Sequence, residues 1–335
     1  MQDLNEQLVD AHGRQIRDLR ISLTDRCNFR CFYCLPNGEP PLARKDTILT
    51  FEEIVELSEI FVSLGIEKIR LTGGEPLIRK DVEKLVSKIS GLKPTLKDLA
   101  LTTNGHTLKD RAIDLVEAGL DRITISLDSL KPENFKRITG VDKLEMVLEA
   151  IQAAKRAKLD PVKINAVVVR DYNDDEIVDF ARFARTHDLS VRFIEFMPLD
   201  SGHEWKREMV VSGKEIREAI DSVFPLKLKN MTRGTETAWK YRFEDGSPGE
   251  IGIIAPVTQM FCGACSRIRL TADGQIRTCL FSTEEHNLRD VLRSASNRAE
   301  IVGFIKQIIL TKEPSHQINN EEFVQPSRTM SFIGG

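Results

Sequence analysis

The chain has 335 residues, a formal net charge of −3 and 6% aromatic residues. That length can bury a core in two domains, or in one large domain with an appendage, without disulfide support. The near-neutral charge and the few aromatic residues argue against nucleic acid as the main partner, and no apolar run reaches the roughly eighteen residues that a membrane-spanning helix needs.

The cysteines are expected to serve metal or redox chemistry. The N-terminal stretch MQDLNEQLVDAHGRQIRDLR lacks the apolar core of a signal peptide, so we expect a cytoplasmic protein, in which disulfides are rare. All six cysteines fall into two groups of three, which are Cys27, Cys31 and Cys34, and Cys262, Cys265 and Cys279. Because structural metal sites usually have four protein ligands, we predict two metal sites that are each one ligand short.

In chain order, short β-branched runs alternate with segments of helical periodicity up to about residue 197. The predicted strands are 19–24, 68–72, 99–104, 122–128, 162–169 and 191–197. The clearest helix follows Thr50, the predicted N-cap, with Glu53 completing a capping box. Further helices are predicted at 81–90, 109–118, 144–158 and 174–187. Six strands and five helices indicate a parallel α/β sheet, a partial (βα)6 TIM-like barrel open at one side.

The pattern changes after about residue 200. It predicts a helix near 212–222, strands in WKYRF and EIGIIAPV, a hairpin at 267–281 around an Asp-Gly turn, and a helix near 298–310. We therefore expect a barrel domain at 1–200 and a smaller C-terminal α+β domain at 201–335, which closes the open side and carries the second cysteine group.

The first cysteine group directly follows the first predicted strand, where functional residues of barrel folds gather. Its C-x3-C-x2-C spacing could hold zinc with a histidine from elsewhere, or an iron–sulfur cluster with one open iron. No histidine lies near this loop, and Tyr33 precedes the last cysteine. Downstream, TGGEP at 72–76 follows the second strand, although two glycines alone are also typical of a plain turn.

These motifs together resemble the radical S-adenosylmethionine superfamily. The resemblance implies that the first group binds a [4Fe–4S] cluster whose open iron takes S-adenosyl-L-methionine, which is cleaved reductively to a 5′-deoxyadenosyl radical. It also implies that the cosubstrate is bound at Tyr33, Gly74, Ser126 and Met197.

The second group, in CGACSRIRLTADGQIRTC, again supplies three ligands. A structural zinc knuckle completed by a distant residue remains open, as does a second cluster with an open iron suited to a nitrogen heterocycle. Arg267 and Arg269 alternate on the adjoining strand and so project to one face, where they could grip phosphate or simply face solvent.

Over nearly the whole chain the sequence resembles one family within the superfamily, the MoaA-type GTP 3′,8-cyclases of molybdenum cofactor biosynthesis. The resemblance implies a second [4Fe–4S] cluster that binds guanine, abstraction of the C3′ hydrogen of GTP, and C3′–C8 bond formation to (8S)-3′,8-cyclo-7,8-dihydroguanosine 5′-triphosphate. It implies GTP contacts at Arg20, Arg70, Thr102, Lys163, Arg267, Ile268 and Arg269.

Arg192 and the C-terminal Gly334-Gly335 also match functional positions of this family, and we expect them to act in catalysis. Taken alone, Arg70 or Lys163 could form a strand-end salt bridge, and a terminal Gly-Gly is usually disordered.

The resemblance further implies cyclic pyranopterin monophosphate synthase (MoaC) as the downstream partner and an electron donor such as flavodoxin or ferredoxin. From charge and hydropathy we expect no nucleic acid and no membrane as partners, and a homodimer stays open. Two other functions remain to be separated, a radical enzyme acting on a peptide or another small molecule and a zinc-stabilised nucleic-acid-binding protein.

Overall fold

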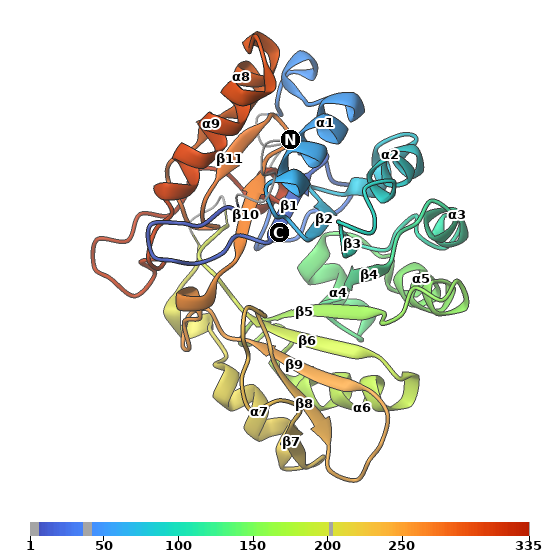
Figure 1. Ribbon diagram of the computed structural model, residues 1–335. Helices are drawn as coiled ribbons and strands as arrows, with labels where there is room; N and C mark the ends of the chain where they lie inside the picture. Colours follow the sequence, from blue (N-terminus) through green and yellow to red (C-terminus); the bar gives the residue numbers. More distant parts are fainter. Residues whose placement is uncertain (1–6, 36–41, 201–203, 335) are drawn as a thin grey trace.

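The computed structural model describes residues 7–35, 42–200 and 204–334, and its centre is one sheet of twelve strands. The strands lie in the order β12-β11-β10-β1-β2-β3-β4-β5-β6-β9-β8-β7 (Figure 1). Their bounds are β1 Asp18–Ser22, β2 Lys68–Thr72, β3 Asp98–Thr103, β4 Arg122–Ser126, β5 Lys163–Val168, β6 Ser190–Glu195, β7 Leu226–Leu228, β8 Trp239–Phe243, β9 Glu250–Ile254, β10 Arg267–Leu270, β11 Gln275–Arg277 and β12 His286–Asn287.

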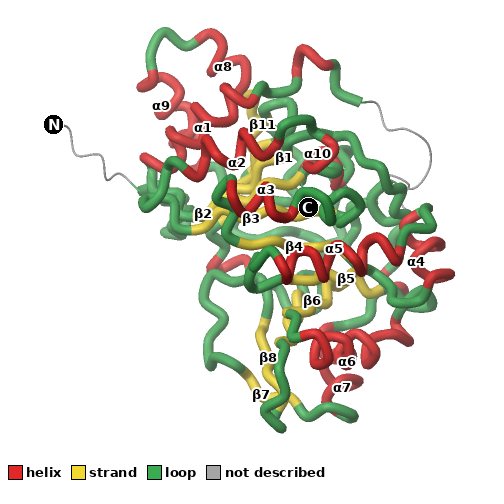
Figure 2. Tube along the Cα trace, turned by 90° about the vertical axis from the view of Figure 1, so that its right-hand side faces the viewer, coloured by secondary structure: helices red, strands yellow, loops and turns green. Residues whose placement is uncertain are grey.

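Most of the helices pack on the outside of this sheet (Figures 1 and 2). Their bounds are α1 Phe51–Ser63, α2 Val82–Ser90, α3 Ala112–Glu117, α4 Pro132–Thr139, α5 Leu144–Arg156, α6 Ile177–His187, α7 Gly213–Asp221, α8 Leu288–Ser294, α9 Arg298–Leu310 and α10 Met330–Ile333. In the described ranges, no helix has both the length and the apolar character that crossing a bilayer requires.

The six predicted strands all form, and β1 to β6 pair in parallel in chain order. Most of the observed strands end one to two residues before the predicted ends, because the chain leaves the ladder to enter the loops that carry the site. The five predicted helices also form. A further helix, α4, which the periodicity did not predict, lies in the connection between β4 and β5.

Strands of the C-terminal part join both edges of the six-stranded sheet, which the sequence pattern did not predict. β10 pairs in parallel with β1, and β9 pairs in parallel with β6. The predicted hairpin is confirmed, with β10 and β11 antiparallel around Asp273-Gly274. The division at residue 200 stays a prediction, since the strands on either side of it share one sheet.

Alternation along the parallel strands separates the core from the site. In β1, Leu19 and Ile21 are buried in the main hydrophobic core, whereas Arg20 between them faces the opposite side. The sheet therefore presents an apolar face to the helices and a polar face to its concave side.

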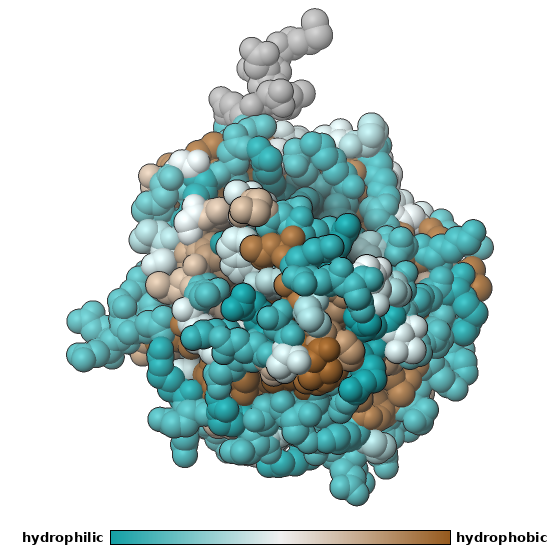
Figure 3. Space-filling view, turned by 90° about the horizontal axis from the view of Figure 1, so that it is seen from below, coloured by the Kyte–Doolittle hydropathy of each residue, from teal (hydrophilic) through white to brown (hydrophobic). Residues whose placement is uncertain are grey.

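The helix after Thr50 begins with the predicted capping box, in which the Glu53 N–H donates to the Thr50 hydroxyl and the Thr50 N–H donates to the Glu53 carboxylate. The molecular face in Figure 3 is mainly hydrophilic, with apolar side chains in small separate groups, as is usual for a folded surface.

Candidate active site

All six cysteines line one cavity of about 400 Å³ on the concave side of the sheet. The cavity also brings together most of the other side chains that the sequence predicted, namely Arg20, Tyr33, Arg70, Gly74, Thr102, Ser126, Lys163, Arg192, Met197, Arg267 and Arg269. Ile268 and Gly334 are exceptions among the described residues, because neither lines the cavity and the Ile268 side chain is buried in the main core. Gly335 lies outside the described residues.

The first cysteine loop follows β1 and packs against the end of α4. The Arg30 N–H donates to the Thr139 carbonyl (2.8 Å), and the Phe32 N–H donates to the Ile138 carbonyl (3.0 Å). The Cys27 sulfur accepts a hydrogen bond from the Phe29 N–H (3.4 Å). The helix that the sequence did not predict is therefore the support on which this loop is built.

The glycines after β2 allow a close approach to the cysteine loop. The Gly74 N–H donates to the Thr24 carbonyl (2.7 Å), and the Glu75 N–H donates to the Arg26 carbonyl (2.8 Å). A Cβ on Gly74 would lie 2.1 Å from the Arg26 oxygen, a distance that atoms cannot adopt. A plain surface turn would not require the absence of a Cβ at this position. The glycines are therefore required by the contact between the two loops.

Glu75 is fully buried and ties the same loop to the end of β3. Its carboxylate accepts hydrogen bonds from the Thr103 hydroxyl (2.7 Å) and from the Asn104 N–H (2.7 Å). Burial raises its pKa to about 7 against these bonds, which act to lower it. The carboxylate thus fixes the position of the loop that faces the cavity.

The first cysteine set suits a group that supplies positive charge. None of its thiols is in a disulfide, and burial raises the pKa of Cys27 to about 11 and that of Cys34 to about 12. A thiolate at these positions therefore needs bound iron or a similar cation to form at neutral pH. Within the described residues, no set of three His, Cys, Asp or Glu side chains is arranged for a single metal ion.

The second cysteine set has more cationic surroundings. Burial raises the pKa of Cys265, but the Arg267 guanidinium and the Lys312 ammonium outweigh it and lower that pKa to about 7. The Arg267 side chain donates to the Cys265 sulfur (3.6 Å). The buried Arg14 guanidinium anchors this loop by donating a hydrogen bond to the Cys262 carbonyl (3.0 Å). Both cysteine sets thus provide three free thiols to the cavity, as a cluster with an open iron requires.

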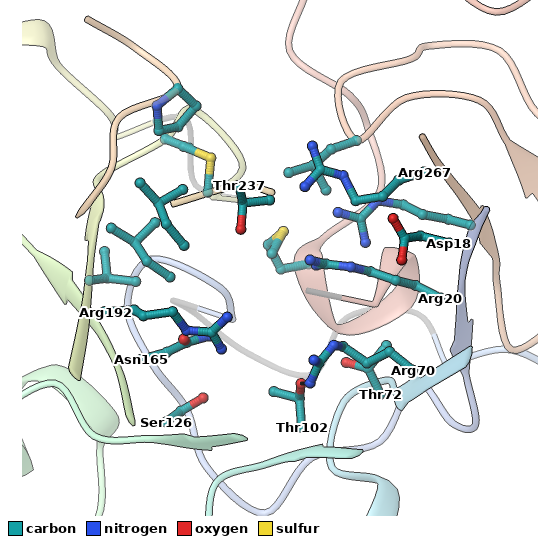
Figure 4. Close-up of a pocket in the computed structure, with 18 of the residues that line it drawn as sticks. Asp18, Arg20, Arg70, Thr72, Thr102, Ser126, Asn165, Arg192, Thr237 and Arg267 are labelled. Carbon is teal, nitrogen blue, oxygen red and sulfur yellow. Dashed lines mark hydrogen bonds between the residues drawn. The ribbon is translucent and has the colours of Figure 1, made fainter. Parts of the chain in front are cut away.

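Strand register places three arginines side by side. Arg20 in β1 pairs with Arg269 in β10 on one side and with Arg70 in β2 on the other. Residues paired across neighbouring strands point to the same face, so these guanidiniums converge. Figure 4 shows Arg20, Arg70 and Arg267 on one side of the cavity and Arg192 and Asn165 opposite.

These cations lack acidic partners. Among the residues that the structure describes, no carboxylate forms an ion pair with Arg20, Arg70, Lys163, Arg192, Arg267 or Arg269. Burial, reinforced by the neighbouring arginines, lowers the pKa of Arg20 and Arg70 to about 9 and that of Lys163 to about 7. The salt-bridge alternative is therefore wrong for Arg70 and Lys163 within the described chain. Such a cavity favours a polyanion.

Hydroxyl groups hold two of these arginines in place. Arg70 donates to the hydroxyls of Thr102 and Thr124, each at 3.1 Å, and Arg192 donates to Thr124 at 3.0 Å. Thr102, predicted as a substrate contact, thus also orients a guanidinium. Neutral partners position the charge without cancelling it.

Sequence reasoning missed Asp128, which fixes the orientation of Tyr33. The Tyr33 hydroxyl donates to the Asp128 carboxylate (2.6 Å), which also accepts the Val167 N–H (2.9 Å). Burial raises the pKa of Asp128 to about 6. Its position after β4, two residues beyond Ser126, was the signal that could have identified it.

Other lining residues carried weaker signals. Asn165 faces Arg192 from the neighbouring strand, and Thr237 and His316 come from loops of the C-terminal part. No motif marks Thr237 or His316 in the sequence, because only the fold brings those loops to the cavity.

The C-terminal tail enters the site region. Gly334 has φ +79°, and its carbonyl accepts a hydrogen bond from Arg269. A Cβ there would lie 2.8 Å from the Thr72 methyl group. The tail is therefore ordered up to Gly334 against β1 and β2, contrary to the usual behaviour of a terminal Gly-Gly.

Comparison with family models divides the chain into two matched regions. Residues 21–184 match the Radical SAM superfamily, and residues 189–318 match Molybdenum Cofactor Synthesis C. Several curated relatives are GTP 3′,8-cyclases. That of Streptomyces coelicolor is 46% identical over 98% of this chain and 96% of its own length, and that of Syntrophomonas wolfei is 44% identical over 98% and 100%.

Solved structures with a similar fold have low sequence identity. Streptococcus suis SuiB bound to S-adenosylmethionine gives a TM-score of 0.61 at 15% identity, covering 88% of this chain and 69% of that one. Native anSMEcpe with bound AdoMet gives 0.58 at 14% identity, covering 90% and 82%. These likenesses concern the fold.

Proposed function

The chain belongs to the GTP 3′,8-cyclase family of radical S-adenosylmethionine enzymes. We propose which residues of its cavity bind the cosubstrate and which bind GTP in the cyclase reaction. The family reaction is the first step of molybdenum cofactor biosynthesis, which agrees with the match to the C-terminal region. The observation that carries our assignment is one cavity with cysteine thiols from two sites and six cations that have no acidic partner in the described chain. A nucleoside triphosphate and an iron-bound cosubstrate fit these groups.

The two cysteine sets would each hold a [4Fe–4S] cluster. S-adenosyl-L-methionine would be held at the first cluster, where its reductive cleavage would supply the radical chemistry needed to remove the C3′ hydrogen of GTP. We assign its binding to Gly74, Tyr33, Ser126 and Met197, all of which line the cavity. Asp128 holds Tyr33 from behind, so the ring presents one fixed face.

Arg20, Arg70, Lys163, Arg267 and Arg269 would bind the triphosphate, because they converge from four strands on one cavity. Ile268 lies between the last two on β10 and, with its side chain in the core, would contribute only through its main chain. Arg192, held by Thr124 across from Arg70, is suitably placed to orient the ribose. Gly334, bonded to Arg269, would close the site and exclude water.

The test is an anoxic reconstitution followed by turnover with three substrates. We expect about eight irons per chain and 5′-deoxyadenosine together with a cyclised product from GTP, but no such product from ATP or a control peptide. Bound zinc with little iron would contradict both cluster assignments. Turnover of the peptide without turnover of GTP would contradict the substrate assignment.

The proposal includes partners that the fold does not identify. We assign the product to cyclic pyranopterin monophosphate synthase, and electron supply to a donor such as flavodoxin or ferredoxin, since the cosubstrate is cleaved reductively. A cytoplasmic location suits six free thiols. Sedimentation of the reconstituted protein tests a homodimer, and limited proteolysis tests the proposed boundary at residue 200, where preferential cleavage is expected.

A further inference from the structure

His316 is a buried histidine without a hydrogen-bond partner. It follows α9, is 9% exposed and lines the same cavity as the cysteines. In the described parts of the chain, neither of its ring nitrogens has a hydrogen bond of normal geometry, although the Pro256 carbonyl lies near the ring. Its ring packs against Phe281, with 5.1 Å between the ring centroids. Phe281 is two residues beyond Cys279, so this histidine lies on the side of the cavity that carries the second cysteine set.

Leaving such a group unpaired is costly. A buried polar atom without a partner costs about 1–3 kcal/mol, and most such atoms in native proteins are paired or have a functional reason not to be. His316 is one of the side chains that line the cavity. A ligand that enters the cavity can therefore supply the missing hydrogen bonds.

The segment that carries His316 is firmly anchored. The Lys312 ammonium is buried and donates to the carbonyls of Arg267 (3.0 Å) and Thr278. The Glu313 carboxylate accepts the Thr278 hydroxyl (2.7 Å). These bonds fix the chain four residues before the histidine.

Arg14 adds a second anchor from the N-terminal part. Its guanidinium donates to the carbonyls of Glu313 (2.6 Å), Pro314 (2.9 Å) and Cys262 (3.0 Å). The same guanidinium is paired with Asp10 within the fold. One arginine thus links the second cysteine loop to the segment before His316, so the two move together.

The surroundings of His316 differ from the cationic wall. Pro256, Leu280 and Phe281 line the cavity with it, and the last of these is in contact with the ring. Burial lowers the pKa of His316, so the neutral imidazole predominates at neutral pH. A neutral imidazole has one hydrogen-bond donor and one acceptor, and a purine base likewise offers both kinds of group. A triphosphate offers only acceptors, which suit the arginines.

We propose that His316 is a substrate-binding residue whose imidazole hydrogen-bonds to the purine of bound GTP. This inference rests on the proposed function of the cavity. The GTP contacts assigned above are cationic side chains, one threonine and one main-chain segment. They serve the phosphates and the ribose. His316 would add a polar contact to the base from the side of the second cysteine set.

The experiment measures nucleotide binding by anoxic calorimetry on reconstituted holoenzyme, with GTP and inorganic tripolyphosphate as the two probes. His316→Phe keeps the ring volume but removes both nitrogens. We expect it to weaken GTP about tenfold, the effect of one hydrogen bond, and to leave tripolyphosphate binding unchanged. His106→Phe is the matched control, because His106 also has a ring nitrogen without a partner in the described chain but is absent from the cavity lining.

Iron content and the electron paramagnetic resonance spectrum without nucleotide are recorded for each variant. If His316→Phe fails to load iron, His316→Gln, which retains a donor and an acceptor, and His316→Leu are compared instead. A loss of GTP affinity in the leucine variant that glutamine partly restores supports the inference.

Three results would overturn it. Equal weakening of GTP and tripolyphosphate would indicate a general structural role. Unchanged GTP binding would show that the imidazole does not touch the base. An altered spectrum in the absence of nucleotide would indicate that His316 is itself a cluster ligand. If the unmodified protein binds no GTP, the proposed function fails, a different result from each of these.

Discussion

Two neighbouring glycines determine how closely the loop after β2 approaches the first cysteine loop. Gly73 has φ +142°, and a Cβ on Gly74 would overlap the Arg26 carbonyl. The hydrogen bonds from Gly74 and Glu75 to Thr24 and Arg26 depend on that approach. The positions of the cysteines therefore depend on residues that carry no side chain.

Gly74→Ala should separate the two loops and impair the first cluster. We expect about half of the iron to be lost and reductive cleavage of S-adenosylmethionine to stop, because the Cβ has no space beside Arg26. Gly303→Ala is the control, since a Cβ there meets nothing within 4 Å. Iron analysis of both variants checks this, and full iron in Gly74→Ala would contradict it.

Lys163 should make GTP binding dependent on pH. Burial, followed by repulsion from Arg122 and Arg192, lowers its pKa to about 7, so the free protein holds it only partly protonated at neutral pH. A bound polyanion favours the ammonium form and draws in a proton. Affinity should therefore be greatest below pH 7 and should fall as pH rises through that pKa.

The comparison uses Lys163→Arg, which stays protonated throughout. Calorimetry between about pH 6 and pH 9 should show a smaller decline in GTP affinity for the variant than for the unmodified chain. Ionisation of the nucleotide itself affects both proteins equally. Parallel pH profiles would exclude Lys163 as the titrating group.

At the scale of elements, helix α1 has the most complete end signals. Thr50→Ala should lower the free energy of unfolding by about 1 kcal/mol, because the Glu53 N–H loses its acceptor. Thr50→Ser should retain most of the stability. Denaturant unfolding measures both, and GTP binding should not change, since Thr50 is outside the cavity lining. An alanine variant as stable as the parent would show that the cap contributes nothing here.

Local patterns predicted most elements because each predicted strand and helix has its own apolar period. Helix α4 escaped, although Pro132 at its first turn and Gly140 at its left-handed C-cap are ordinary end signals. Helix α4 has only eight residues and follows β4 closely. In the connection between β4 and β5, the clearer helical periodicity was therefore that of the longer α5. The pairing of β9 and β10 with the barrel edges also escaped, because register between distant strands leaves no local trace.

At the scale of the molecule, the cysteine spacing and the family resemblance singled out residues that the fold brings to one cavity. The convergence of the arginines, predicted from motifs, is explained by register between β10, β1 and β2. Asp128 and His316 were missed for different reasons. The first lies two residues beyond Ser126, which the resemblance singled out, and the second acquires its meaning only from burial and from a ring without partners in the described chain.

A further prediction at the scale of the molecule concerns the C-terminal tail. Deleting Gly334 and Gly335 should abolish cyclisation while leaving both clusters loaded, because the tail contacts Arg269 but supplies no thiol. Iron content and product formation are measured on the same preparation. Cyclisation at the normal rate after deletion would exclude a role for the tail.

The sheet order also determines when each strand can find its neighbour during synthesis. β1 is made early, yet its outer edge pairs with β10, whose first residue in the ladder is Arg267 opposite Asp18. Until that late segment leaves the ribosome, a parallel strand presents unpaired backbone groups, which are prone to associate with other chains. We therefore expect nascent chains that stall before residue 267 to aggregate more readily than the finished chain, which pelleting of truncated and full-length translation products would measure.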